Sequence, residues 1–176
     1  MTTKNARGFI KNTKGAAGVH LVVAELSLRG YIALPTTRNL KAVDIVAFNN
    51  KLSRFAFIQV KSTDQPRSGW PVYTIKNADN WEKEIRDALF LGERFFYVFV
   101  VLPSKTQSEP VYYIVPSADV AEMLINKTRE YLREHPSVGV ARQLVAWGYG
   151  GLRPEEDKRY RNKWELLGLD ETEPSE

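Results

Sequence analysis

The stretch FAFIQVKST, Phe55–Thr63, reads as an apolar strand that becomes polar at Gln59 and Lys61. Successive side chains of a strand point to opposite faces of a sheet, so Gln59 and Lys61 share one face. Polar groups beside a buried surface need partners. The stretch therefore predicts a polar cluster on one face of a largely buried strand.

A second apolar run, AVDIVAF at Ala42–Phe48, precedes it and is interrupted by Asp44. The turn-like NNKLS between the two runs predicts an antiparallel hairpin. In that hairpin Asp44 falls opposite residues near Val60, so its carboxylate can meet Gln59 and Lys61 across the two strands.

The remaining periodic segments predict an α/β fold, a central mixed β-sheet flanked by helices. We expect helices over residues 15–29, about 80–91, 117–135 and 154–167, and strands over 31–34, 72–75, 95–102 and 111–115. Gly30, Gly92 and Gly168 are the expected helix stops. The glycine-rich WGYGG, 147–151, lacks the lysine and hydroxyl residues of a phosphate loop, so we interpret it as a turn.

A chain of 176 residues fits one domain, here 1–169, followed by an acidic tail over 170–176 that we expect to be disordered. The absence of cysteine excludes a disulfide framework, a thiolate zinc site and a cysteine nucleophile. Without an apolar run long enough for a leader or a membrane span, we expect a cytoplasmic protein and no membrane partner.

The net charge is +4, and Lys4, Arg7, Lys11 and Lys14 form a basic N-terminal arm. Such a charge balance permits a phosphate-bearing partner without identifying one.

Three interpretations of Asp44, Gln59 and Lys61 follow from the residues alone. The first is a structural ion pair between Asp44 and Lys61, with Gln59 completing the hydrogen bonds. The second is a Mg²⁺ site built from the Asp44 carboxylate, the Gln59 amide oxygen and the Val60 carbonyl, with Lys61 beside an attacking water. The third is a small-molecule pocket, for which no specific motif speaks.

The spacing of these residues resembles the PD-(D/E)XK nuclease superfamily, whose core is αβββαβ. In that family an acidic residue begins the second strand and an acid-x-Lys motif lies on the third. Asp44 and the QVK of Gln59–Lys61 are similar to a variant with glutamine in the acidic place. The resemblance covers about residues 15–102, with valine at Val43 where the family name has proline.

This resemblance implies a Mg²⁺- or Mn²⁺-dependent endonuclease that hydrolyses DNA phosphodiester bonds. Asp44 is then the principal metal ligand, Gln59 a neutral ligand, and Lys61 the cation beside the attacking water. Cutting both strands implies a homodimer. The alternatives are an inactive nucleic-acid-binding module with the same fold, or a structural protein with an internal ion pair.

Family members commonly carry a glutamate in the first helix, and the matching position here is Val19. We expect Glu25, ahead of His20, to compensate, although Glu25 is also spaced to pair with Arg29.

The residues around the motif predict a nucleic-acid rim. It comprises Arg38, Lys41, Ser62, Thr63, Gln65, Arg67 and Trp70. Arginine binds phosphate through two hydrogen bonds, and tryptophan stacks on bases. The alternative is an ordinary solvated loop whose Trp70 anchors a hydrophobic cluster.

Overall fold

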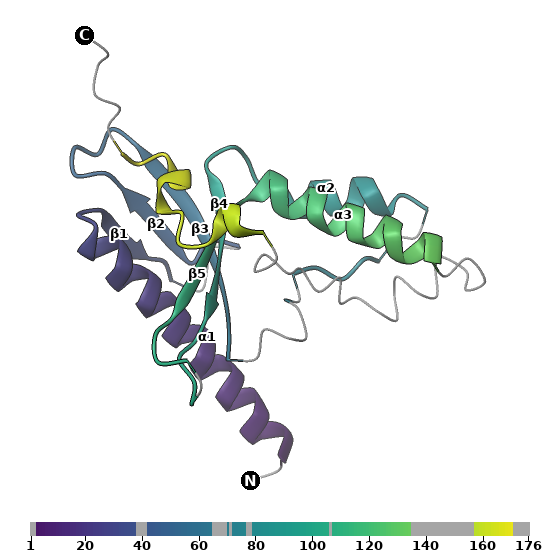
Figure 1. Cartoon of the computed structure of the whole chain (residues 1–176), viewed down its shortest axis with the longest axis horizontal. Coiled ribbons are helices and arrows are strands. Elements are labelled where there is room, and N and C mark those ends of the chain that lie inside the picture. The colour runs from purple at the N-terminus through teal and green to yellow at the C-terminus, as the bar shows by residue number, and fades with distance from the viewer. Residues whose placement is uncertain are drawn as a thin grey trace.

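A computed structural model describes residues 3–37, 42–64, 70, 72–76, 79–105, 107–134 and 157–170 (Figure 1). Its elements are α1 (Thr3–Leu28), β1 (Ile32–Pro35), β2 (Ile45–Phe48), β3 (Phe55–Thr63), α2 (Trp81–Leu89), β4 (Phe95–Val101), β5 (Val111–Pro116), α3 (Ser117–Glu134), η3 (Lys158–Tyr160) and η4 (Trp164–Leu167).

The five strands form one mixed sheet in the order β1-β2-β3-β4-β5. β3 and β4 run parallel, whereas the other neighbouring strands are antiparallel. A parallel pair needs a crossover connection, and α2 lies in it. The α/β prediction of a mixed sheet with flanking helices is confirmed, and the elements from α1 to β4 follow the order αβββαβ.

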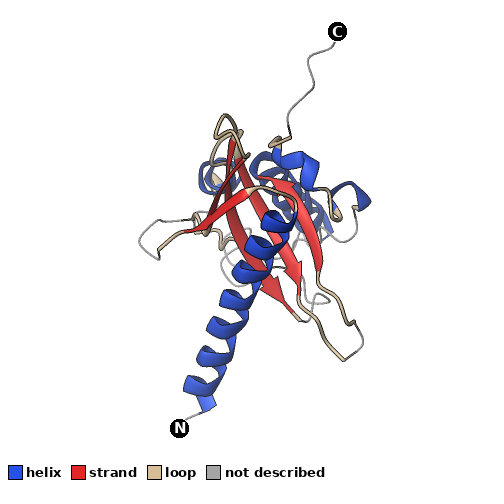
Figure 2. Ribbon diagram, turned by 90° about the vertical axis from the view of Figure 1, so that its left-hand side faces the viewer, coloured by secondary structure: helices blue, strands red, loops and turns tan. Residues whose placement is uncertain are grey.

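Helix α1 covers one face of the sheet. Its Val22 and Leu26 are fully buried in the same hydrophobic cluster as Ile45 and Ile58. The approach is closest at Gly18, where an added Cβ would lie 2.6 Å from the Cβ of Ser62. The turns before Gly18 extend past the sheet, and Figure 2 shows this N-terminal half projecting beyond the strands.

The other face of the sheet is covered by α2 and α3. Ile85 of α2 and Leu124 of α3 are buried in a second cluster with Tyr97 and Phe99 of β4. Two ion pairs hold the helices together, Arg129 with Glu82 at 2.5 Å and Arg86 with Glu122. Because β4 is buried on both faces, it reads as the continuous apolar run seen in the sequence.

The predicted C-terminal helix is wrong over its described part. Residues 157–170 form the two short 3₁₀ helices η3 and η4 instead. Asn162 separates them with φ of +55°, and its side-chain oxygen accepts a 3.1 Å hydrogen bond from the Tyr112 N–H. The predicted stop at Gly168 is confirmed, with φ of +62°.

Two further predictions differ from the structure. Residues 72–76 form no strand, because Glu84 of α2 accepts the Lys76 N–H and the Tyr73 hydroxyl, both at 2.8 Å. Asp170, assigned to the tail, lies among the described residues and accepts from the Tyr31 hydroxyl. Residues 171–176, the WGYGG turn and residues 154–156 lie outside the described part.

Among the described residues, no helix is both long enough and apolar enough to span a bilayer.

Candidate active site

The candidate site lies where β2 begins and β3 continues beyond it. The register pairs Ile45 with Ile58, so Asp44, one residue earlier, is level with Gln59. This is one residue from the predicted position opposite Val60. The Asp44 N–H donates to the Ile58 carbonyl at 2.8 Å, which extends the hairpin by one hydrogen bond.

The Asp44 carboxylate then binds β3 directly. Its Oδ2 accepts a 2.7 Å hydrogen bond from the Val60 N–H. In an extended strand the N–H and C=O of one residue point to the same side, so the Val60 carbonyl also points toward Asp44. The Val60 carbonyl thus points to the same side of β3 as the Asp44 carboxylate.

The side chains of Gln59 and Lys61 lie on the sheet face opposite α1. The alternation on β3 turns Ile58 and Val60 toward the α1 cluster and Phe57 toward the α2–α3 side. Gln59 pairs with Tyr97 and Lys61 with Phe99, both of which belong to the α2–α3 cluster. Gln59 and Lys61 are themselves only half-buried, so water and solutes reach this part of the face.

The Asp44 backbone is held from the β1 side by Thr36. The Thr36 N–H donates to the Asp44 carbonyl at 2.9 Å, and the Thr36 hydroxyl donates to the Val43 carbonyl. Two residues before Asp44, Ala42 adopts a φ of +65°, a conformation that non-glycine residues avoid. Strained backbone of this kind often occurs at functional sites. Thr36 was not among the predicted site residues, and its sequence signal is its position directly after β1.

Ser62, predicted as a nucleic-acid contact, faces the other way. Its hydroxyl donates to the Lys14 carbonyl at 2.8 Å, so it fastens α1 to β3. The alternation of the strand places it on the α1 face, which corrects its assignment to the rim. By the same alternation Thr63 shares a face with Gln59 and Lys61.

Trp70 is not available for stacking on a base. Only 2 % of it is exposed, and its ring meets that of Phe99 edge-on at 5.3 Å between centroids. The alternative interpretation, a tryptophan that anchors a loop in a hydrophobic cluster, is the one that the structure supports. Because Phe99 is the register partner of Lys61, Trp70 is part of the apolar layer next to the site.

Glu25 lies apart from Asp44, Gln59 and Lys61. It belongs to α1, on the opposite face of the sheet, and its Oε1 is 2.8 Å from an Arg29 guanidinium nitrogen. The geometry therefore supports the surface ion pair and not a role at the site. His20 on the same helix is exposed, and Val19 packs against the α1 cluster.

The other predicted rim residues, Arg38, Lys41, Gln65 and Arg67, lie outside the described residues.

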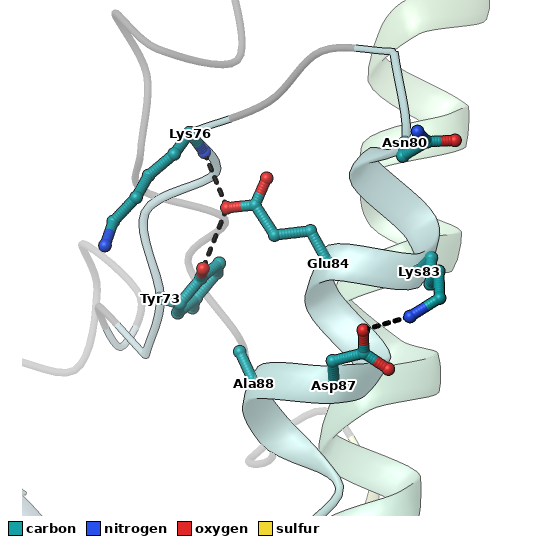
Figure 3. A pocket seen from close by; sticks show the side chains of 7 residues that line it. All are labelled: Tyr73, Lys76, Asn80, Lys83, Glu84, Asp87 and Ala88. Carbon is teal, nitrogen blue, oxygen red and sulfur yellow. Dashed lines mark hydrogen bonds and ion pairs between the residues drawn. The ribbon is translucent and has the colours of Figure 1, made fainter.

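A separate hollow of about 530 Å³ lies between residues 73–76 and α2 (Figure 3). It is lined by Tyr73, Lys76, Asn80, Lys83, Glu84, Asp87 and Ala88. Figure 3 shows Glu84 bridging to Tyr73 and Lys76, while Lys83 pairs with Asp87. Burial, with the Glu84 carboxylate next, raises the pKa of Tyr73 to about 12. None of the predicted site residues lines this hollow, and its polar groups fasten the segment to the helix.

Comparison of the chain with protein-family models, with curated proteins and with solved structures finds no match.

Proposed function

We propose that this protein is a metal-dependent endonuclease that hydrolyses phosphodiester bonds of DNA. The observation that carries the proposal is the hydrogen bond from the Val60 N–H to Asp44 Oδ2 at 2.7 Å. It brings a carboxylate beside the Gln59–Lys61 segment at the start of β2. The order αβββαβ, with Asp44 directly before the second strand and Gln59 and Lys61 on the third, supports the resemblance to the PD-(D/E)XK nucleases.

The oxygen atoms at this position suit Mg²⁺ or Mn²⁺. Asp44 Oδ1, the Val60 carbonyl and the Gln59 amide oxygen are the hard donors that Mg²⁺ prefers. Of these three donors only Asp44 is charged; among the described residues no group of three or more His, Cys, Asp or Glu side chains could hold a metal. A substrate phosphate would add the remaining oxygens, and the metal bound there would polarise it.

Lys61 supplies the positive charge in this proposal. An ammonium on the same face as Gln59 would stabilise the negative charge that develops on the phosphate and favour ionisation of the attacking water. The water oxygen forms a new bond to phosphorus while the bond to the sugar oxygen opposite it breaks, and the leaving oxygen takes up a proton. One such site cuts one strand, so cutting both strands calls for a homodimer. Cytoplasmic DNA is the substrate that fits the expected location.

A second candidate function is a DNA-binding module that keeps the fold without the chemistry. The observations that favour it are Val19 in place of the first-helix glutamate, the neutral Gln59, and the placement of Glu25 on the other face.

Cleavage of supercoiled plasmid and branched DNA tests the two functions. The native chain, Lys61→Ala and Lys51→Ala are compared with Mg²⁺, with Mn²⁺ and with EDTA. Lys51 lies in the exposed turn between β2 and β3 and is the matched control. We expect cleavage that needs the metal, is lost in Lys61→Ala by at least about 100-fold, and persists in Lys51→Ala.

Cleavage retained by a folded Lys61→Ala chain would overturn the assignment of Lys61. No cleavage by native protein that binds DNA equally well in EDTA would establish the binding module instead.

A further inference from the structure

The positive charge of this protein is concentrated at one end of the sequence. The first 24 residues contain Lys4, Arg7, Lys11 and Lys14 and no acidic residue. These four account for the whole net charge of +4, because the rest of the chain carries 21 acidic side chains and as many basic ones. The site proposed above makes no use of this charge.

The four basic positions lie on one side of a single helix. α1 is continuous from Thr3 to Leu28, and intervals of three and four residues bring positions 4, 7, 11 and 14 to the same side. We call these four positions the basic stripe. At a rise of 1.5 Å per residue the stripe is about 15 Å long.

Lys14 shows which way this side of the helix faces. Its Nζ lies 2.6 Å from an Asp64 carboxylate oxygen, and its carbonyl accepts from Ser62. Gly18, one turn further on the same side, meets Ser62 as well. The stripe therefore lies on the side that meets the carboxyl end of β3, the strand that carries Gln59 and Lys61.

The helix continues past that end of the strand. Figure 2 shows the first turns of α1 projecting beyond the sheet. A long polyanion that crosses the end of β3 would therefore pass the projecting turns on the α1 side, with the side chains of Gln59 and Lys61 on the opposite side of the same strand.

We propose that the basic stripe binds the phosphate backbone of duplex DNA next to the candidate site. The inference rests on the proposed function and adds to it how the substrate is held. Phosphates of one strand follow each other every 3.4 Å along the duplex axis, so the part of the stripe from Lys4 to Lys11, about 10 Å long, matches about three of them, while Lys14 is paired with Asp64. Contacts of this kind are independent of sequence and position the duplex without reading bases.

An anionic membrane is the competing partner for a basic helix. Among residues 3–14 only Phe9 and Ile10 are large and apolar. Interfacial helices insert a broad apolar face into the lipid, and two such residues provide little of it. The composition of the arm therefore favours nucleic acid over lipid.

The test measures DNA affinity in EDTA, so that cleavage plays no part. Fluorescence anisotropy of a labelled 20-base-pair duplex is recorded over a range of salt concentrations for three proteins. These are the native chain, Lys4→Gln/Arg7→Gln/Lys11→Gln, and the control Lys51→Gln/Lys83→Gln/Lys163→Gln, which removes the same charge from three other places. Glutamine keeps the helix propensity, and circular dichroism checks it.

We expect the stripe variant to bind at least about tenfold more weakly and its slope of log K against log salt to fall by about 2 to 3, because about 0.9 is lost per released phosphate contact. The control variant should bind like the native chain. Unchanged affinity in the stripe variant, or an equal loss in the control, would overturn the inference. So would binding to phosphatidylserine vesicles that depends on the stripe while DNA binding does not.

The same proteins separate the two proposals. Suppose that cleavage depends on Lys61 and that the stripe variant binds DNA as tightly as the native chain. This result would support the nuclease and exclude a role of the stripe in DNA binding. DNA affinity that depends on the stripe, with no cleavage by the native chain, would support the stripe and exclude the nuclease.

Discussion

The two faces of β3 differ in burial and in polarity. Toward α1 the strand presents Ala56 and Ile58, both fully buried. Toward α2 and α3 it presents Phe57, Gln59 and Lys61, all only half-buried. The change to polar residues begins level with Asp44, one residue before the paired part of β2 begins.

The difference teaches that one strand can serve stability on one side and chemistry on the other. The α1 face is fully buried and apolar at Ala56 and Ile58, so substitutions there should alter the free energy of unfolding. The opposite face holds polar groups that water can reach, so substitutions there should alter activity first. The following predictions test this division, from the largest expected effect to the smallest.

Ile58→Ala should lower the free energy of unfolding by about 2 to 5 kcal/mol, because it opens a cavity beneath α1. Urea denaturation measures the change. Cleavage per folded molecule, assayed well below the unfolding transition, should match that of the native chain. Loss of cleavage with native stability would contradict the division between the faces, as would a large loss of stability in Lys61→Ala.

Gly18→Ala should destabilise the protein by about 1 to 3 kcal/mol, since the new Cβ meets the Ser62 Cβ at 2.6 Å and the two elements must separate. Gly15→Ala is the matched control on the same helix. Nothing lies within 4 Å of an added Cβ there, so helix propensity should stabilise it by up to about 1 kcal/mol. Thermal unfolding that shifts the same way in both variants would refute the close contact.

Asp44 has a structural role, as acceptor for the Val60 N–H, and a proposed role as metal ligand, and two substitutions separate them. Asp44→Ala leaves the Val60 N–H without its acceptor and should cost about 1 to 3 kcal/mol. Asp44→Asn keeps an oxygen for that N–H and should cost less than about 1 kcal/mol. Both should lose cleavage, because both remove the carboxylate charge. A fully active Asp44→Asn chain would exclude Asp44 as a metal ligand.

High pH should lower the free energy of unfolding through one buried tyrosine on each face of the sheet. Burial raises the pKa of Tyr97, on the α2–α3 side, to about 12, and burial followed by the nearby Glu25 charge does the same for Tyr112 on the α1 side. Unfolded tyrosine ionises near pH 10, so between pH 10 and 12 the unfolded chain has released more protons. The stabilisation is complete below pH 10 and is lost as the pH rises to 12.

Urea midpoints recorded from pH 8 to 12 measure this loss, and Tyr97→Phe or Tyr112→Phe should each flatten the curve. A curve that only one of the two substitutions flattens would show that the faces differ in solvent access at β4 and β5.

Glu25→Gln should have the smallest effect. Its partly exposed pair with Arg29 is worth less than about 0.5 kcal/mol, and the residue lies across the sheet from Lys61. Stability and cleavage should both stay native. A cleavage rate that falls tenfold would bring Glu25 back into the site and overturn the placement of α1 relative to it.

Much of the fold followed from periodicity alone. The five strands of the sheet, the helices α2 and α3 and the second half of α1 coincide with apolar patterns of the matching period. The first half of α1 was predicted only as a basic arm, because residues 3–14 have no apolar periodicity, whereas the helix begins at Thr3. The C-terminal segment was predicted wrongly because its apolar spacing suits a helix. In the structure the Asn162 side chain instead accepts a hydrogen bond from the Tyr112 N–H of β5. That tertiary contact leaves no periodic signal in the sequence.

The sequence predicted the part of the candidate site that is set by the register of the β2–β3 hairpin. It did not predict on which face of the sheet the surrounding side chains lie. The Asp44 carboxylate meets the Val60 N–H, between Gln59 and Lys61, because the turn fixes the register of the two strands. Ser62 was misplaced although period-two alternation already sets it on the other face from Lys61. Trp70 could not be placed, since a tryptophan in a loop has no periodic pattern that distinguishes packing from an exposed role.

The segment that closes the described chain has a consequence for how the protein folds. Arg54 of the β2–β3 hairpin donates to the Asp170 carbonyl at 2.8 Å, and Tyr31 binds the Asp170 side chain, 139 residues away. Contacts between such distant parts of a chain form late and slow the search for the native state. During synthesis the contacts of Arg54 and Tyr31 with Asp170 therefore cannot form until residue 170 has been made, long after the hairpin that carries Asp44 and Lys61.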